Sequence, residues 1–341
     1  MKSSSFFCVI AVLLVFGSVV AAEPHYQKIG EIPIGGEGGW DILTIDSAAR
    51  RLYLSHATKV VVVDIDKGNV VSEIADTPGV HQFIAIPELN RGFSSNGKED
   101  KVGVIDLKTG ATTSKLDTGK NPDAMVYSPK RGQLYVGNHT GKSATVIDVK
   151  QPKAIATVPL DGEPEFSVAD DAADRIYCNI EDKSAVAVID AAKHQVMTYW
   201  PLEPGKSPTG IALDAAHHRL FAACENLLVM CDTTSGKVVA TVPTGRGADG
   251  CAFDDETGLI FVPCGEGVTT IAKETTEGLT VIDNIKTERG ARTIALDPKT
   301  HRIFMPTAQF EPPAPSVASP ARPRIVPNTQ KLLVYGPAEG R

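Results

Sequence analysis

Short runs in which apolar and polar residues alternate cover most of the chain, and helical periodicity is nearly absent. Residues 123–160 show the pattern, with the apolar runs DAMVYS, QLYVGN, ATVIDV and AIATVPL. The segments between these runs, PKRG, HTGKS and KQPK, are rich in residues that favour turns. The alternation therefore predicts four short β-strands joined by tight turns within about 40 residues.

The same four-run pattern returns along the chain at a nearly fixed interval. An Asp closes each VID-like run, and the first four intervals between these Asp residues are 42 residues and the fifth is 51: Asp64, Asp106, Asp148, Asp190, Asp232 and Asp283. An aromatic residue in the preceding run recurs seven times at intervals of 40 to 44: Tyr53, Phe93, Tyr135, Tyr177, Phe221, Phe261 and Phe304. Seven four-stranded repeats predict an all-β fold, a single seven-bladed β-propeller.

The two ends of the repeat region predict how the ring closes. Residues 26–34, YQKIGEIPI, precede the first complete repeat and resemble the fourth run of other repeats, whereas the last repeat stops after its third run, KLLVYG. We therefore expect the N-terminal strand to supply the missing outer strand of the last blade. One propeller over residues 23–341 accounts for the length better than two domains do.

The first 22 residues have the character of a secretion signal. Lys2 precedes an apolar run over residues 6–20, and Val20 and Ala22 are small residues at the positions expected before a cleavage site. This run of 15 residues is shorter than the roughly 20 that a spanning helix needs. We expect residues 1–22 to be a signal peptide and the mature protein to be exported, to a periplasmic or extracellular location, with no membrane span.

The charge balance bears on the choice of partner. The 341 residues include 34 Lys and Arg against 41 Asp and Glu, which gives a formal net charge of −7. Because nucleic-acid binding depends on neutralising phosphates, this balance disfavours a nucleic-acid partner. A small molecule or a protein is the partner that we expect, and we expect the chain to be a monomer.

Five cysteines remain once Cys8 of the leader is set aside. Repeat phase predicts that Cys224, Cys251 and Cys264 lie near one another. An exported chain with an odd number of cysteines keeps at least one thiol free. We expect at most one disulfide among these three residues.

The repeat resembles that of a known family. QLYVGN at 133–138, VIDLKTG at 104–110 and TGKNPD at 118–123 are similar to the repeats of the YVTN-type β-propeller proteins, the YncE-like group, and the likeness covers essentially the whole mature chain. It implies a seven-bladed propeller and, often, export; some members are reported to bind DNA. No catalytic residue can be carried over from it, and the Asn of the repeat motif is replaced in several blades, as by His56 and Ile180.

Repeat phase also predicts where chemistry would be concentrated. The position twelve residues before each repeat aromatic begins the innermost strand, so all seven copies are expected at one mouth of the central channel: Asp41, His81, Asp123, Glu165, Thr209, Asp249 and Arg292. His56 and His139 are predicted on the next ring outward. We take Asp41, His81, Asp123, Glu165, Asp249, Arg292, His56 and His139 as candidate ligand-binding residues. Four other histidines are expected in turns, with His217, His218 and His301 on the opposite face and His194 in an outer turn.

The chemistry of this ring leaves several readings open. Carboxylates and imidazoles suit a cation, an amine or a divalent metal, although no motif identifies a cofactor. Clustered carboxylates also raise one another's pKa, which suits acid–base catalysis. The same residues would serve equally as turn caps or as the lining of a water-filled channel.

Two stretches depart from the common repeat length. Residues 265–278 are predicted as an insert between the second and third strands of blade six, and the Pro-rich residues 308–330 as one in blade seven. Both are expected on the same face as the candidate ligand residues, as a lid or docking element or as surface loops without a role.

Three classes of function follow. The first is an exported propeller that acts as a binding scaffold, with its ligand, a small molecule, metal ion or partner protein, at the channel mouth. The alternatives are a lactonase-like hydrolase or lyase acting at the same mouth, and DNA binding by analogy with the resembled family. Neither a substrate nor a reaction can be identified from the sequence.

Overall fold

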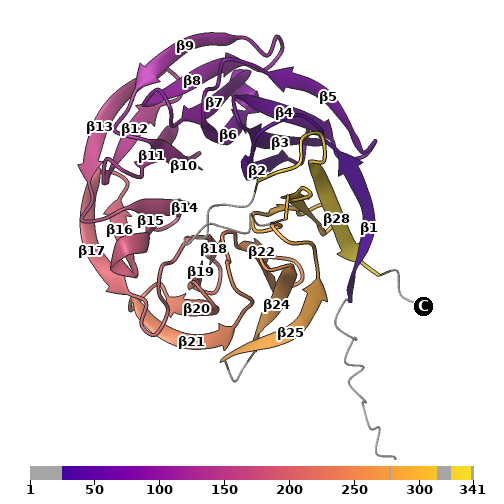
Figure 1. Ribbon diagram of the computed structural model, residues 1–341. Coiled ribbons are helices and arrows are strands. Elements are labelled where there is room, and N and C mark those ends of the chain that lie inside the picture. Colours follow the sequence, from indigo (N-terminus) through magenta and orange to yellow (C-terminus); the bar gives the residue numbers. More distant parts are fainter. Residues whose placement is uncertain (1–24, 276–277, 313–323, 339–341) are drawn as a thin grey trace, which may run out of the picture.

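The computed structural model describes residues 25–275, 278–312 and 324–338. Over these residues the chain forms seven four-stranded antiparallel sheets arranged as a ring (Figure 1). Two short 3-10 turns, η1 (Pro87–Leu89) and η2 (Glu181–Lys183), are the helical elements of the described chain. The predicted all-β, seven-bladed propeller is therefore confirmed. The expected signal peptide, residues 1–22, lies outside the described residues.

Each blade runs from an inner strand near the axis to an outer strand at the rim (Figure 1). The innermost strands are β2 (Trp40–Asp46), β6 (Val80–Ile86), β10 (Pro122–Ser128), β14 (Pro164–Asp170), β18 (Ile211–Asp214), β22 (Ala252–Asp254) and β26 (Ala295–Asp297). The second strands are β3 (Arg51–His56), β7 (Arg91–Asn96), β11 (Gln133–Asn138), β15 (Arg175–Ile180), β19 (Arg219–Ala223), β23 (Leu259–Cys264) and β27 (Arg302–Thr307). The third strands are β4 (Lys59–Asp64), β8 (Lys101–Asp106), β12 (Ser143–Asp148), β16 (Ala185–Asp190), β20 (Leu227–Asp232), β24 (Val268–Thr275) and β28 (Lys331–Pro337). The outer strands are β5 (Asn69–Ile74), β9 (Thr112–Asp117), β13 (Lys153–Pro159), β17 (Gln195–Pro201), β21 (Lys237–Pro243), β25 (Gly278–Lys286) and β1 (Tyr26–Pro33).

The ring closes between the two ends of the chain, as expected. Strand β1 pairs antiparallel with β28, from Tyr26 opposite Pro337 to Pro33 opposite Lys331. The last sheet thus has the order β1-β28-β27-β26, and the first and last strands of the chain lie side by side (Figure 1). A blade completed by both ends of the chain leaves no opening in the ring.

Alternating side chains of each second strand pack against the two neighbouring blades. In β3, Leu52 and Leu54 belong to the apolar cluster shared with blade seven, whereas Tyr53 belongs to the cluster shared with blade two. Because side chains of a strand alternate between faces, a strand between two blades must be apolar at nearly every position. The consecutive buried residues of β3 meet this demand.

The Asp that marks the repeat caps the turn after the third strand. In blade one, Asp64 Oδ1 accepts hydrogen bonds from the backbone N–H groups of Asp66 and Lys67, at 3.2 and 2.9 Å. Asp148 and Asp190 make the same pair of bonds to the second and third residues after them. The repeat interval therefore reports a turn that recurs because a carboxylate can satisfy its backbone donors.

The prediction that residues 265–278 form an insert between the second and third strands of blade six is wrong. Residues 265–267 form a tight turn, and β24 pairs with β23 so that Lys273, opposite Leu259, takes the place that Asp232, opposite Arg219, has in blade five. Asp283 lies in the outer strand β25, opposite Ile271. Strands β24 and β25 are longer than the third and fourth strands of the other blades, and their added residues lie at the end away from the channel mouth. A VID-like run suits a third and a fourth strand equally. The Asp that ends the third strand in the preceding blades therefore has its sequence counterpart, Asp283, in the fourth strand of blade six.

Residues 308–330 connect β27 to β28 at the end of the blade that faces the mouth, and residues 313–323 of this connection are not among those described. Phe310 forms an isolated bridge with Ile325, and its ring lies 6.2 Å from the Trp40 ring, centroid to centroid. Arg289 stacks over the same Phe310 ring at 5.6 Å. The described ends of this segment therefore pack beside the start of β2.

The five cysteines of the described chain are free thiols. Cys251 and Cys264 share the apolar cluster between blades five and six, and Cys224 lies in the adjoining cluster. Burial raises the pKa of the Cys224 thiol to about 12, which makes it unreactive. Within the described ranges, no helix has the length and apolar character needed to cross a membrane.

Candidate functional site

The candidate residues of blades one to four lie where their inner strands depart from regular pairing. Asp41, His81, Asp123 and Glu165 are the second residues of β2, β6, β10 and β14. In each of these strands the pairing register shifts at this point, for example between Trp40 and Leu43. A bulge turns a side chain out of the sheet plane and is common beside functional sites. Here it turns four titratable side chains to the axial end of the ring.

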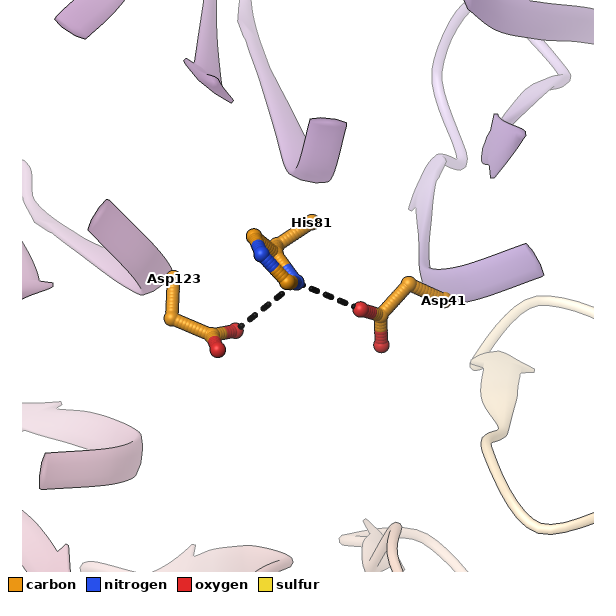
Figure 2. Close-up of side chains that lie close together, drawn as sticks. All are labelled: Asp41, His81 and Asp123. Atoms are coloured by element: carbon orange, nitrogen blue, oxygen red, sulfur yellow. Dashed lines mark hydrogen bonds and ion pairs between the residues drawn. The ribbon is translucent and has the colours of Figure 1, made fainter. Parts of the chain in front are cut away.

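Three of these residues form a compact cluster. His81 Nδ1 lies 2.7 Å from Asp41 Oδ2 and 3.6 Å from Asp123 Oδ1. Figure 2 shows the imidazole between the two carboxylates, with each side chain arriving from a different blade. One ligating atom from each of the three residues lies within 4.8 Å of the others. Ligands of a tetrahedral zinc ion lie about 3.3 Å apart, so small side-chain movements would complete a metal-binding arrangement.

The far nitrogen of the His81 ring is also held. A Cβ placed on Gly97 would lie 2.5 Å from Asn121 Oδ1 and 2.6 Å from His81 Nε2, so both atoms lie over this glycine. The Asn121 side chain is close enough to His81 to help raise the pKa of its imidazole. A Nε2–H group that donates to Asn121 leaves the Nδ1 lone pair facing the carboxylates, as in metal sites whose histidine is oriented by a second residue.

The electrostatics of the cluster favour a cation. Burial alone lowers the pKa of His81, but Asp41 and Asp123 raise it to about 9, so an imidazolium occupies the space between them at neutral pH. Burial raises the pKa of Asp123, and nearby Asp41 and Glu165 raise it further. A divalent cation that displaced the His81 proton would place more positive charge among these carboxylates.

A second group lies in blades three and four. His139 Nδ1 is 3.1 Å from Glu165 Oε1, and Glu181, the first residue of η2, brings a third ligating atom within 4.8 Å. The hydrogen bond with Glu165 raises the pKa of His139 to about 9. The His139 backbone N–H donates to the Asn121 carbonyl at 2.9 Å, which links this group to the first.

The remaining candidates occupy different surroundings. Arg292 Nε donates to Asp249 Oδ2 at 2.6 Å. Thr209 Oγ1 donates to the Ala248 carbonyl at 3.1 Å and has a structural role. His56 is fully buried, and its Nε2 lies 3.1 Å from the Gly35 carbonyl. The structure therefore brings His139 close to this ring of side chains and places His56 beneath the surface.

Asn121 lies beside His81, and Glu163 Oε2 lies 4.0 Å from His139 Nε2, but neither residue was among the sequence candidates. Both lie two residues before a candidate carboxylate, in the segments KNPD and GEPE. The backbone of Asn121 is left-handed, with φ of 53°, a conformation that asparagine tolerates well. The Asn-Pro pair was a usable signal for such a turn, but nothing in the sequence indicated that its amide faces His81.

His194, His217, His218 and His301 lie in turns, as predicted. His217 and His301 occupy turns between first and second strands, where each bonds an Asp at 2.7 Å, Asp214 and Asp254 respectively. These turns lie on the face opposite Asp41 and His81. They provide matched histidines for experiments on the mouth.

Comparisons with known proteins identify the architecture. No protein-family model matches the sequence, and no curated protein matches it. Among solved structures, hydrazine synthase of Kuenenia stuttgartiensis is 15% identical with a TM-score of 0.71, covering 86% of this chain and 96% of that one. A chain in a crystal structure of the mitotic checkpoint complex is 13% identical with a TM-score of 0.74, covering 98% of both chains. At these identities the likeness shows the seven-bladed propeller fold alone, and membership of the YVTN-type group stays a prediction.

Proposed function

We propose that this protein is an exported binding scaffold whose channel mouth holds a divalent metal ion between Asp41, His81 and Asp123. The observation that carries the proposal is the approach of three ligating atoms, from three separate blades, to within 4.8 Å of one another. One imidazole and two carboxylates suit a first-row transition metal such as Zn²⁺ or Mn²⁺. The proposal that the protein is exported rests on residues 1–22, which resemble a secretion signal.

The surroundings support a ligand role more than a purely structural one. Turn-capping carboxylates elsewhere in the chain bond backbone N–H groups of their own turn, as Asp64 does. The Asp41 carboxylate instead bonds a side chain from the next blade, and side chains of the three residues are 17 to 28% exposed. A half-buried cluster that bonds across blades and remains open to solvent is suited to exchange its proton for a metal ion.

The test is a metal count on the protein produced from the full-length chain. The parent, His81→Ala and Asp123→Asn proteins would be stripped with a chelator, dialysed against Zn²⁺ or Mn²⁺, and analysed by elemental mass spectrometry. We expect about one metal ion per parent chain and far less in both variants at a metal concentration near the parent's Kd, since losing one of three ligands should weaken the affinity at least about tenfold.

His217→Ala is the matched control, because it removes another Asp-bonded histidine from the opposite face. Equal metal content in the parent, His81→Ala and Asp123→Asn would refute the proposal. Loss of metal in His217→Ala alone would place the site on the other face.

A further inference from the structure

We infer that the mouth binds a ligand carrying a carboxylate or phosphate group, whose oxygens bridge the metal ion and the guanidinium of Arg292. This inference rests on the proposed function and adds the chemical class of the ligand. The observation behind it is an arginine that is held in place beside Asp41, the first ligand of the proposed metal site.

The backbone around Arg292 is tied to the blades on both sides. Its carbonyl accepts a hydrogen bond from Gly250 N–H of blade six at 2.9 Å. The next residue, Thr293, donates through Oγ1 to the carbonyl of Asp41 in blade one at 3.1 Å. Arg292 is therefore held next to the first ligand of the proposed metal site.

The orientation of the Arg292 side chain is also fixed. Arg292 Nε donates to Asp249 Oδ2 at 2.6 Å, which fixes the plane of the guanidinium. No hydrogen bond within the described ranges occupies its two terminal amino groups, and the side chain is 40% exposed. A guanidinium anchored through Nε presents a two-pronged donor, the geometry that arginine uses to bind carboxylates and phosphates.

The charges at the mouth explain why the metal ion and Arg292 would bind the ligand together. Without a metal ion, the His81 imidazolium offsets only one of the two carboxylate charges of Asp41 and Asp123, and the cluster offers no coordination position to an anion at Arg292. A divalent cation neutralises these two carboxylates, and three protein ligands leave it at least one open position for an oxygen of the bound molecule. Binding of the anion should therefore require the metal. An amine ligand would show the opposite behaviour, since the metal would compete with it and Arg292 would repel it.

The test uses inorganic phosphate and acetate as separate probes, titrated calorimetrically into the Zn²⁺-loaded and the chelator-treated full protein. We expect at least one probe to bind the loaded protein and neither to bind the stripped protein; the stronger probe identifies the oxyanion. Arg292→Gln and Arg292→Lys should weaken anion binding about ten- to hundredfold while the metal content stays at the parent level, because a charged two-pronged contact is lost.

Arg246→Gln is the control, since Arg246 also pairs with a carboxylate through Nε, Glu266 at 3.1 Å, but is 84% exposed. Anion binding that is unchanged in both Arg292 variants, or equally strong without metal, overturns the inference and leaves the metal site in place. A loaded protein that binds neither probe overturns it likewise. A protein that binds no metal overturns the proposed function and this inference together.

Discussion

The imidazole of His81 has two chemically different ends. Nδ1 faces Asp41 and Asp123, whereas Nε2 faces the Asn121 amide over Gly97. The ring can therefore serve as a cation when protonated and as a metal ligand when neutral, without turning. Repeat phase was enough to predict that His81 and the carboxylates share a mouth, since equivalent positions share a face. It carried no information on rotamers, and so it missed Asn121 and set the buried His56 beside the ring.

Metal affinity should depend on pH through His81. Burial lowers the pKa of His81, but the flanking carboxylates raise it to about 9. A proton must therefore leave Nδ1 before a metal can bind at neutral pH. Affinity should rise roughly tenfold per pH unit from pH 7 to 8 and level off above about 9. Calorimetry in buffers of different ionisation enthalpy would measure the released proton. Affinity that is flat across this range would mean that His81 is not a ligand.

Asn121 should act by orienting His81. Asn121→Gly keeps the left-handed backbone available and removes the amide, so we expect metal affinity to fall about ten- to hundredfold, as when an orienting partner is lost from other metal sites. Asn90→Gly is the control, because Asn90 is also left-handed and bonds Asp106 in a turn on the other face. Similar metal affinity in the two variants would show that the Asn121 amide has no orienting role.

Among the elements, the innermost strands of blades one to four matter most to the site. The bulges of β2, β6, β10 and β14 aim the site residues, but apolar alternation alone does not reveal a bulge, because the flanking residues keep their burial. The strand runs themselves were predictable because each must be apolar on two faces. The positions of the third and fourth strands of blade six were not predictable, because third and fourth strands share one sequence pattern.

Strand β1 should stabilise the ring through its inward face. Ile32 is 4% exposed in the cluster between blades seven and one, whereas Ile29 on the same strand is 45% exposed. Ile32→Ala should lower the free energy of unfolding by about 2–5 kcal/mol, and Ile29→Ala by less than about 1 kcal/mol. Chemical denaturation measures both. Equal, small losses would argue against β1 as the closing strand.

At the scale of the whole molecule, an ion pair between blades one and seven also closes the ring, on the face opposite the mouth. Arg50 Nη1 of blade one pairs with Asp297 Oδ2 of blade seven at 2.8 Å, and Asp297 is fully buried. The same guanidinium pairs with Asp66, which is 54% exposed, at 2.8 Å. The ring and its closure were predictable from seven repeats and their phase at the termini. Contacts such as Arg50 with Asp297 were not, because they join residues that are distant in sequence.

Removing the buried charge should destabilise the ring more than removing the exposed one. Asp297→Asn leaves Arg50 without its buried partner and should cost about 2–3 kcal/mol of unfolding free energy, whereas Asp66→Asn should cost much less because solvent screens the Asp66 charge. Burial alone would raise the pKa of Asp297, but the hydrogen bonds from Thr300, Ser47 and Arg50 together lower it. Its contribution is therefore present above pH 4 and lost as the pH falls below, so the two variants should converge in acid. Equal losses in both variants at neutral pH would contradict this ranking.

The most direct test of the proposed metal site is a crystal structure of the full mature ring grown with Zn²⁺, with anomalous data collected above and below the zinc absorption edge. We predict an anomalous peak at the channel mouth, about 2.0–2.2 Å from His81 Nδ1 and from one carboxylate oxygen each of Asp41 and Asp123. A mouth without a peak in crystals that contain bound zinc elsewhere, with His81 still bonded to Asp41, would contradict the account.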